Sequence, residues 1–281
     1  MEYLFQIANT VIALRVPQKM QIDEAYRDFL TEDKIPDVVI EFRTWCGEIS
    51  CEEDVLIYQG GYDVYKTPFG FAVGVGASEA GEPYLYMPIQ ENSRLQVCYV
   101  KESEWWRFTY VSQIFRVIAW ERILNRNHVF LLHASFIEWY HRGILFTAPS
   151  GTGKSTQAEL WEIYEGAEII NGDRAALSRM DGAWMAYGLP LAGSSHIYKN
   201  KCCRVNAVVV LRQGKKNCLY RLKPSEAFRK IYAETTVQYW DAEFQTILTD
   251  LLSDFVLRVP VYMLECIPEK SAVDLLKKEL E

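Results

Sequence analysis

A glycine-bearing loop and an acidic turn hold the residues whose types and spacing could do chemistry. The loop, 148–156, reads Ala-Pro-Ser-Gly-Thr-Gly-Lys-Ser-Thr and follows the apolar run 143–147. A strand, a glycine-bearing loop, Gly-Lys-Ser/Thr and a helix, in that order, cradle the phosphates of a nucleotide. Backbone N–H groups of the loop and of the helix N-terminus point at the phosphate oxygens, and the helix dipole favours their charge.

The side chains of this loop have distinct roles in that interpretation. Lys154 reaches the β- and γ-phosphates, and the hydroxyl of Ser155 ligates Mg²⁺. The strict pattern begins with glycine, and Ala148 keeps that position small. An ordinary loop is the alternative, because Gly and Pro punctuate loops in general. We expect the nucleotide to contact Ser150, Gly151, Thr152, Gly153, Lys154, Ser155 and Thr156.

The acidic turn, 171–174, reads Asn-Gly-Asp-Arg. It follows a predicted helix from 155 to 165, capped by Gly166, and a short strand at 168–170. This order places Asp173 beside the γ-phosphate, where a carboxylate can hold Mg²⁺ or accept the proton of an attacking hydroxyl. The alternative is a plain turn, since Asn-Gly and Gly-Asp form turns readily.

Two β-prone runs, 129–138 and 143–147, precede the phosphate loop. Only a few residues separate them, and a parallel pair would need a crossover of about a dozen residues or more. We therefore expect an antiparallel hairpin, and a mixed sheet in place of a doubly wound parallel one.

The rest of the chain indicates how this site is supported. Short runs rich in Tyr, Phe and Val predict a smaller β-rich domain with an antiparallel sheet at 1–104, with turns at 60–61, 68 and 81–83. Apolar residues at helical spacing predict a connecting helix at 105–126, which begins the second domain, 105–281. Near the end we expect a helical stretch from Ser225, its N-cap, to 255, broken near 237–240, and then a strand and a final helix.

Composition excludes some partners. The 281 residues are 49% hydrophobic, and 30 basic against 37 acidic residues give a net charge of −7, which disfavours nucleic acid and anionic membranes. Seven cysteines without C-x-x-C spacing indicate free thiols in a reducing compartment. Neither a signal peptide nor an apolar membrane span is visible, so we expect a soluble, cytoplasmic protein.

His133-Ala134, the hairpin, the loop and the acidic turn together resemble the catalytic domain of HPr kinase/phosphorylase, which shares a P-loop fold with phosphoenolpyruvate carboxykinase. The resemblance covers roughly residues 128–212. It implies that Asp173 is the catalytic base for a serine hydroxyl and that His133 lies near the phosphates and the base. Gly172 replaces the first Asp of the family's Asp-Asp-Arg segment, and 188–195 stands where that family has a glutamate-containing loop.

These observations predict an α/β fold with a mixed-sheet P-loop kinase domain of this type. We expect ATP and Mg²⁺ as cofactors, with Lys154, Asp173 and His133 catalytic and with Ser155 and Asp173 as metal ligands. Base and metal ligand are competing roles for Asp173, and the sequence leaves both open. The expected reaction transfers the γ-phosphoryl group of ATP to a hydroxyl, that of serine in the family, on a peptide or protein. A small-molecule kinase, a carboxykinase-like reaction and a non-catalytic ATP-binding switch are alternatives, and homo-oligomerisation is left open.

Overall fold

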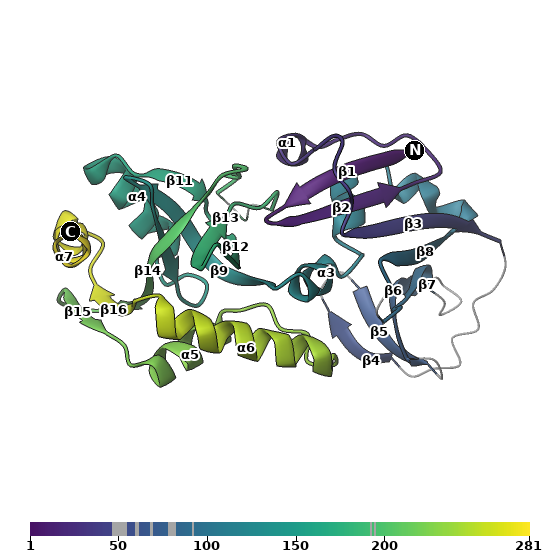
Figure 1. The fold of residues 1–281 in the computed structure, drawn as a ribbon. Helices are drawn as coiled ribbons and strands as arrows, with labels where there is room; N and C mark the ends of the chain where they lie inside the picture. Colours follow the sequence, from purple (N-terminus) through teal and green to yellow (C-terminus); the bar gives the residue numbers. More distant parts are fainter. Residues whose placement is uncertain are drawn as a thin grey trace. The chain divides into compact units, whose positions relative to one another are not determined.

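A computed structural model describes residues 1–46, 55–59, 62–67, 70–77, 83–91, 93–191, 193 and 195–281. The turns predicted at 60–61, 68 and 81–82 lie outside these residues. The chain forms two compact units, Met1–Ile123 and Leu124–Glu281 (Figure 1). The placement of a domain boundary at 104 stays a prediction.

The first unit contains a sheet of eight described strands in the order β1-β2-β3-β8-β7-β6-β5-β4. Their bounds are β1 Glu2–Ile7, β2 Thr10–Arg15, β3 Val38–Trp45, β4 Val55–Gln59, β5 Tyr62–Thr67, β6 Gly70–Ala77, β7 Pro83–Pro88 and β8 Leu95–Lys101. The expectation of a purely antiparallel sheet is wrong, because β3 runs parallel to both β2 and β8. A long connection that carries helix α1 (Glu24–Arg27) separates β2 from β3 and permits the parallel crossover.

The stretch predicted as one helix at 105–126 forms three short helices instead: η1 (Glu102–Arg107), α2 (Val111–Phe115) and α3 (Trp120–Arg126). Phe108 leaves the helical region at φ −113° and ψ 70°, and Ala119 takes a left-handed φ of 46°. These breaks change the direction of the chain between the short helices. The apolar side chains of α2 lie in the core. The spacing of apolar residues therefore identified the helical segments but not the breaks between them.

The second unit is built on another sheet of eight described strands. Their bounds are β9 Val129–Trp139, β10 Arg142–Thr147, β11 Glu168–Asn171, β12 Arg174–Met180, β13 Ala183–Tyr187, β14 Cys202–Gln213, β15 Cys218–Arg221 and β16 Val261–Cys266. The order is β10-β9-β12-β13-β14-β16-β15, β11 pairs with β9, and a further β10–β14 pairing closes five of the strands into a ring.

The predicted hairpin before the phosphate loop is confirmed. Strands β9 and β10 pair antiparallel, from Trp139 opposite Arg142 to Ala134 opposite Thr147. Tyr140 and His141 form the tight turn with φ values of 47° and 61°, the left-handed pair that two-residue hairpins favour. On its other side β10 runs parallel to β14, which runs parallel to β16. The sheet is thus mixed, as expected.

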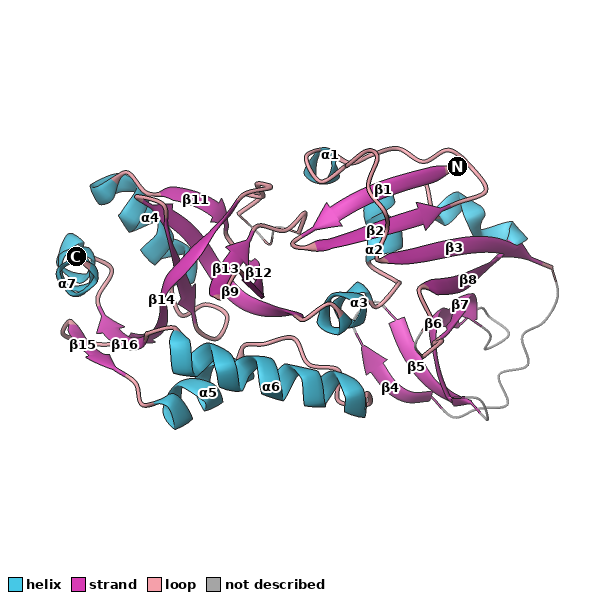
Figure 2. Cartoon of the chain, in the orientation of Figure 1, coloured by secondary structure: helices cyan, strands magenta, loops and turns pink. Residues whose placement is uncertain are grey.

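Helices cover both faces of this sheet (Figure 2). They are α4 Lys154–Glu165, α5 Pro224–Ala233, α6 Ala242–Arg258 and α7 Lys270–Leu280. The predicted break near 237–240 falls between α5 and α6, whereas α5 begins at Pro224 with Lys223 as its N-cap, in place of the expected Ser225. Proline suits the first helical position, because its missing N–H would have no partner there.

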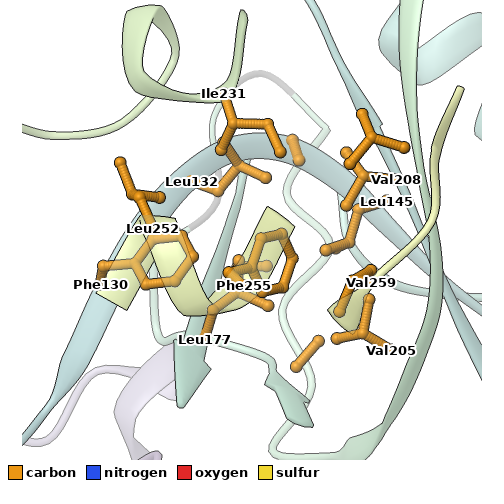
Figure 3. Close-up of a cluster of buried hydrophobic side chains, with 14 of the residues drawn as sticks. Phe130, Leu132, Leu145, Leu177, Val205, Val208, Ile231, Leu252, Phe255 and Val259 are labelled. Carbon is orange, nitrogen blue, oxygen red and sulfur yellow. The ribbon is translucent and has the colours of Figure 1, made fainter. Parts of the chain in front are cut away.

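Two apolar cores fix the sheet between these helices. Phe130, Leu132 and Leu145 pack with Phe255 of α6 on one face (Figure 3). The neighbours Ile144 and Phe146 belong to the core under α4 and α7 on the other face. Successive side chains of β10 thus alternate between two buried faces, as in a strand covered by helices on both sides. This strand ends at Thr147, where the phosphate loop begins.

Within the described parts of the chain, we find no helix long and apolar enough to cross a membrane.

Candidate active site

The loop between β10 and α4 has the backbone that the sequence motif requires. Gly151 and Gly153 have φ values of 77° and 118°, in the region that L side chains rarely adopt. An added Cβ at either position would meet no atom of the described residues within 4 Å, so glycine is needed for backbone conformation and not for space. Helix α4 begins directly after this loop, and Gly166 ends it at a φ of 65°, which confirms the predicted cap.

Lys154 is the first residue of α4, and its side chain reaches back to the start of the phosphate loop. Its side chain is buried, with a relative exposure of 7% for the residue, and Nζ donates a hydrogen bond of 2.8 Å to the carbonyl of Ala148. Burial lowers the pKa of Lys154, while the nearby charges of Glu234 and Asp173 act to raise it. The ammonium group is thus held by a neutral carbonyl, which phosphate oxygens could replace as its partner.

The turn that carries Asp173 is fixed by the fully buried Asn171. Its Oδ1 accepts hydrogen bonds of 2.9 Å from the backbone N–H groups of Asp173 and Arg174. Its Nδ2 donates to the carbonyls of Leu189 (3.1 Å) and Leu191 (2.8 Å). One amide therefore ties the acidic turn to the segment at 188–195.

His133, in the middle of β9, faces Asp173. Its Nε2 lies 3.6 Å from Oδ1 of Asp173, and its Nδ1 lies 3.3 Å from Oε2 of Glu234. The backbone holds the three residues in register: the N–H of His133 donates to the carbonyl of Glu234, and the N–H of Ala134 to the carbonyl of Asp173. A carboxylate beside each ring nitrogen restricts the imidazole to one orientation.

Glu234 was missed by sequence reasoning. It follows α5 and enters the site because the next residue, Thr235, bridges to Leu132 of β9. No motif marks it, and about 100 residues of chain separate it from His133. Its side chain is only 13% exposed, against 31% for His133 and 32% for Asp173.

A cleft of about 300 Å³ joins the loop to the acidic turn. It is lined by His133, Ser150, Gly151, Gly153, Lys154, Ser155, Thr156, Gly172 and Asp173. The structure therefore brings together every predicted site residue except Thr152, which lines a neighbouring pocket.

The segment at 188–195, described except for 192 and 194, passes close to Asp173. A Cβ added to Gly193 would lie 2.9 Å from Oδ1 of Asp173, and one added to Gly172 would lie 2.2 Å from Oγ of Ser195. Nε of Arg174 lies 3.5 Å from Oδ2 of Asp173. Gly172 thus allows the segment to close over the turn.

The oxygen atoms of Ser155 and Asp173 suit a Mg²⁺ ion that is also bound by the phosphates of a nucleotide. Among the described residues no group of three or more His, Cys, Asp or Glu could hold a metal ion. Magnesium usually keeps several waters and binds through one or two carboxylates and the substrate phosphates. The exposed Ser155 and the carboxylate of Asp173 line the same cleft and fit that requirement.

Comparisons with known proteins bear on the fold. No model of a protein family matches the chain, and no curated protein matches it. Among solved structures, the chain is similar to the HPr(Ser) kinase/phosphatase from Coxiella burnetii, with 12% sequence identity and a TM-score of 0.32. The match covers 53% of this chain and 92% of that chain.

Proposed function

We propose that the second unit is an ATP-dependent kinase that transfers the γ-phosphoryl group to a hydroxyl of a peptide or protein. One observation carries the proposal: a single cleft is lined by the phosphate loop with Lys154 and by Asp173 with His133. Phosphoryl transfer depends mainly on positioning and on neutralising charge at the phosphoryl oxygens. The loop supplies amide donors and an ammonium group, and the opposite side of the cleft supplies a carboxylate.

The phosphates are held by the loop in this proposal. Backbone N–H groups of the loop and of the first turn of α4 bind the phosphate oxygens, and Lys154 neutralises their charge. Ser155 would hold Mg²⁺, which supplies further charge neutralisation when bound, and Asp173 serves as the base in this proposal.

Asp173 accepts the acceptor's proton as the hydroxyl oxygen attacks the γ-phosphorus. The bond from this phosphorus to the bridging oxygen breaks, and ADP leaves with that electron pair. An ionised Glu234 can only accept a hydrogen bond, so it favours the tautomer of His133 that carries its proton on Nδ1. Nε2 is then left to face Asp173 and the acceptor.

The accessibility of the site supports a macromolecular acceptor over a small molecule. A metabolite pocket should enclose its ligand, whereas a peptide needs an open approach to the base. About a third of the side-chain surface of both Asp173 and His133 is exposed. A hydroxyl on a peptide or on a protein loop can therefore approach Asp173 from solvent.

The proposal is tested with Lys154→Ala and Asp173→Ala in assays of Mg²⁺-dependent ATP turnover. Both variants should lose most of the activity, while Lys216→Ala, in the exposed turn between β14 and β15, should retain it. Unchanged turnover in both site variants would refute a kinase reaction at this site. Intact-mass screening of candidate peptides and metabolites with ATP identifies the acceptor, as a gain of one phosphoryl group that either variant abolishes.

A further inference from the structure

A second pocket adjoins the phosphate cleft. It measures about 340 Å³, and Gly151, Gly153 and Thr156 line both cavities. Its far wall comes from residues at the carboxyl ends of β14 and β16, among them Leu211 and Pro268. A ligand whose phosphates lie against the loop therefore has a neighbouring cavity for the rest of the molecule. In α/β sheets, ligands bind outside the carboxyl ends of the parallel strands.

A buried amide lines this pocket. Gln157, in the first turn of α4, is only 2% exposed, and its Oε1 has no hydrogen-bond partner among the described residues. Its Nε2 lies 3.3 Å from Sγ of Cys266, which is a weak acceptor. Leaving a buried polar atom unpaired costs free energy, so an unpaired amide at a pocket wall calls for a ligand with complementary polar atoms.

We propose that this pocket binds the nucleobase of the nucleotide and that Gln157 selects adenine. The edge of adenine presents the N6 amino donor beside a ring-nitrogen acceptor, the complement of a carboxamide, whereas the corresponding edge of guanine presents two acceptors. Leu211 and Ile267 offer apolar surface to the faces of the base. The inference rests on the proposed nucleotide site and adds to it the residue that determines which nucleotide enters.

Binding by the full-length protein, measured calorimetrically with Mg²⁺, tests this inference with three probes. ATP offers phosphates and a complete base, purine riboside triphosphate lacks only the exocyclic amine, and inorganic tripolyphosphate lacks the nucleoside. Because the amine satisfies a buried acceptor, ATP should bind about tenfold more tightly than purine riboside triphosphate. Tripolyphosphate should bind more weakly than either.

The variant Gln157→Met keeps the length of the side chain and removes its polar atoms. It should lower the affinity for ATP to that for purine riboside triphosphate and leave tripolyphosphate binding unchanged. The matched control on the same helix is Glu159→Gln, an exposed position outside both pockets, which should preserve the difference between the two nucleotides.

The outcomes separate this inference from the proposed function. If neither ATP nor tripolyphosphate binds, the proposed nucleotide site and this inference both fail. If tripolyphosphate binds as tightly as ATP, the phosphate site stands and the base pocket is refuted. Equal affinity of the unmodified protein for ATP and purine riboside triphosphate overturns the role of the amide even if the variant does not fold. If a folded Gln157→Met protein still binds ATP more tightly than purine riboside triphosphate, the role of the amide is likewise overturned.

Discussion

Nδ1 of His133 lies 3.3 Å from Oε2 of Glu234, and the backbone N–H of His133 donates to the carbonyl of the same residue. Two contacts between one pair of residues hold the imidazole against Asp173. Glu234→Gln retains the shape but can present an amide donor to Nδ1, which favours the wrong tautomer. We expect turnover of ATP to fall about tenfold to a hundredfold with little change in nucleotide affinity.

Steady-state turnover and calorimetric ATP binding, measured on the same preparations, check this expectation. The control Glu162→Gln changes an exposed glutamate of α4 by the same chemistry and should behave as the unmodified protein. Glu234→Asp keeps the charge and should recover part of the activity. A loss of ATP affinity as large as the loss of turnover would argue against a positioning role.

Gly193 limits the space around Asp173. In Gly193→Ala the new Cβ would lie 2.9 Å from Oδ1 of Asp173, so the carboxylate must shift. Displacing a catalytic group by a few tenths of an ångström to 1 Å costs up to about a hundredfold in rate. We expect slower turnover of ATP with unchanged ATP affinity, measured by steady-state kinetics and by calorimetry on the same preparations. Gly182→Ala serves as the control, because that glycine lies in an exposed turn away from the site. Its φ of 82° means that this variant strains the backbone without displacing Asp173.

Asn171 connects the acidic turn to Leu189 and Leu191 through its Nδ2 group. In Asn171→Asp, a carboxylate oxygen would replace this donor and face two backbone carbonyls in a fully buried position. We expect the free energy of unfolding to fall by about 2–4 kcal/mol. The buried carbonyls of Leu189 and Leu191 would lose their hydrogen-bond donor and would face a negatively charged oxygen. Urea unfolding measures the change. A loss below about 0.5 kcal/mol would show that the clamp contributes little to stability.

The sequence predicted the parts of the site that are local in the chain. The loop with Lys154 and the turn with Asp173 are short segments that can be recognised from residue types and spacing. The hydrogen bonds from Asn171 to Leu189 and Leu191, which hold the turn, could not be read from that pattern. Glu234 could not be predicted, because a bridge between Thr235 and Leu132, far apart in sequence, brings it to His133. The parallel pairing of β3 was missed for the same reason: periodicity reports which face a strand buries, but not its neighbour in the sheet.

The first unit contains a buried tyrosine hydroxyl whose effect on stability can be tested. Tyr26 of α1 is 2% exposed and packs its ring against Phe5 and Phe115. Its hydroxyl finds no hydrogen-bond partner in the part of the chain that the structure describes. Tyr26→Phe removes that unpaired group and keeps the aromatic contacts. We expect the free energy of unfolding at neutral pH to rise by about 1 kcal/mol. The matched control is Tyr3→Phe, which should lower it, because the hydroxyl of Tyr3 accepts a hydrogen bond of 3.0 Å from the N–H of Met20.

The pH dependence of stability gives an independent check on Tyr26. Burial raises the pKa of Tyr26 well above its ordinary value of 10.0. Below pH 10.0 the hydroxyl of Tyr26 is protonated in both the folded and the unfolded chain, so it does not make the free energy of unfolding depend on pH. As the pH rises above 10.0, the unfolded chain releases this proton and the folded chain retains it, so the folded state loses stability. Urea unfolding at several pH values should therefore show a smaller alkaline loss in Tyr26→Phe than in the unmodified protein. Parallel curves for the two proteins above this pH would contradict the buried, protonated hydroxyl.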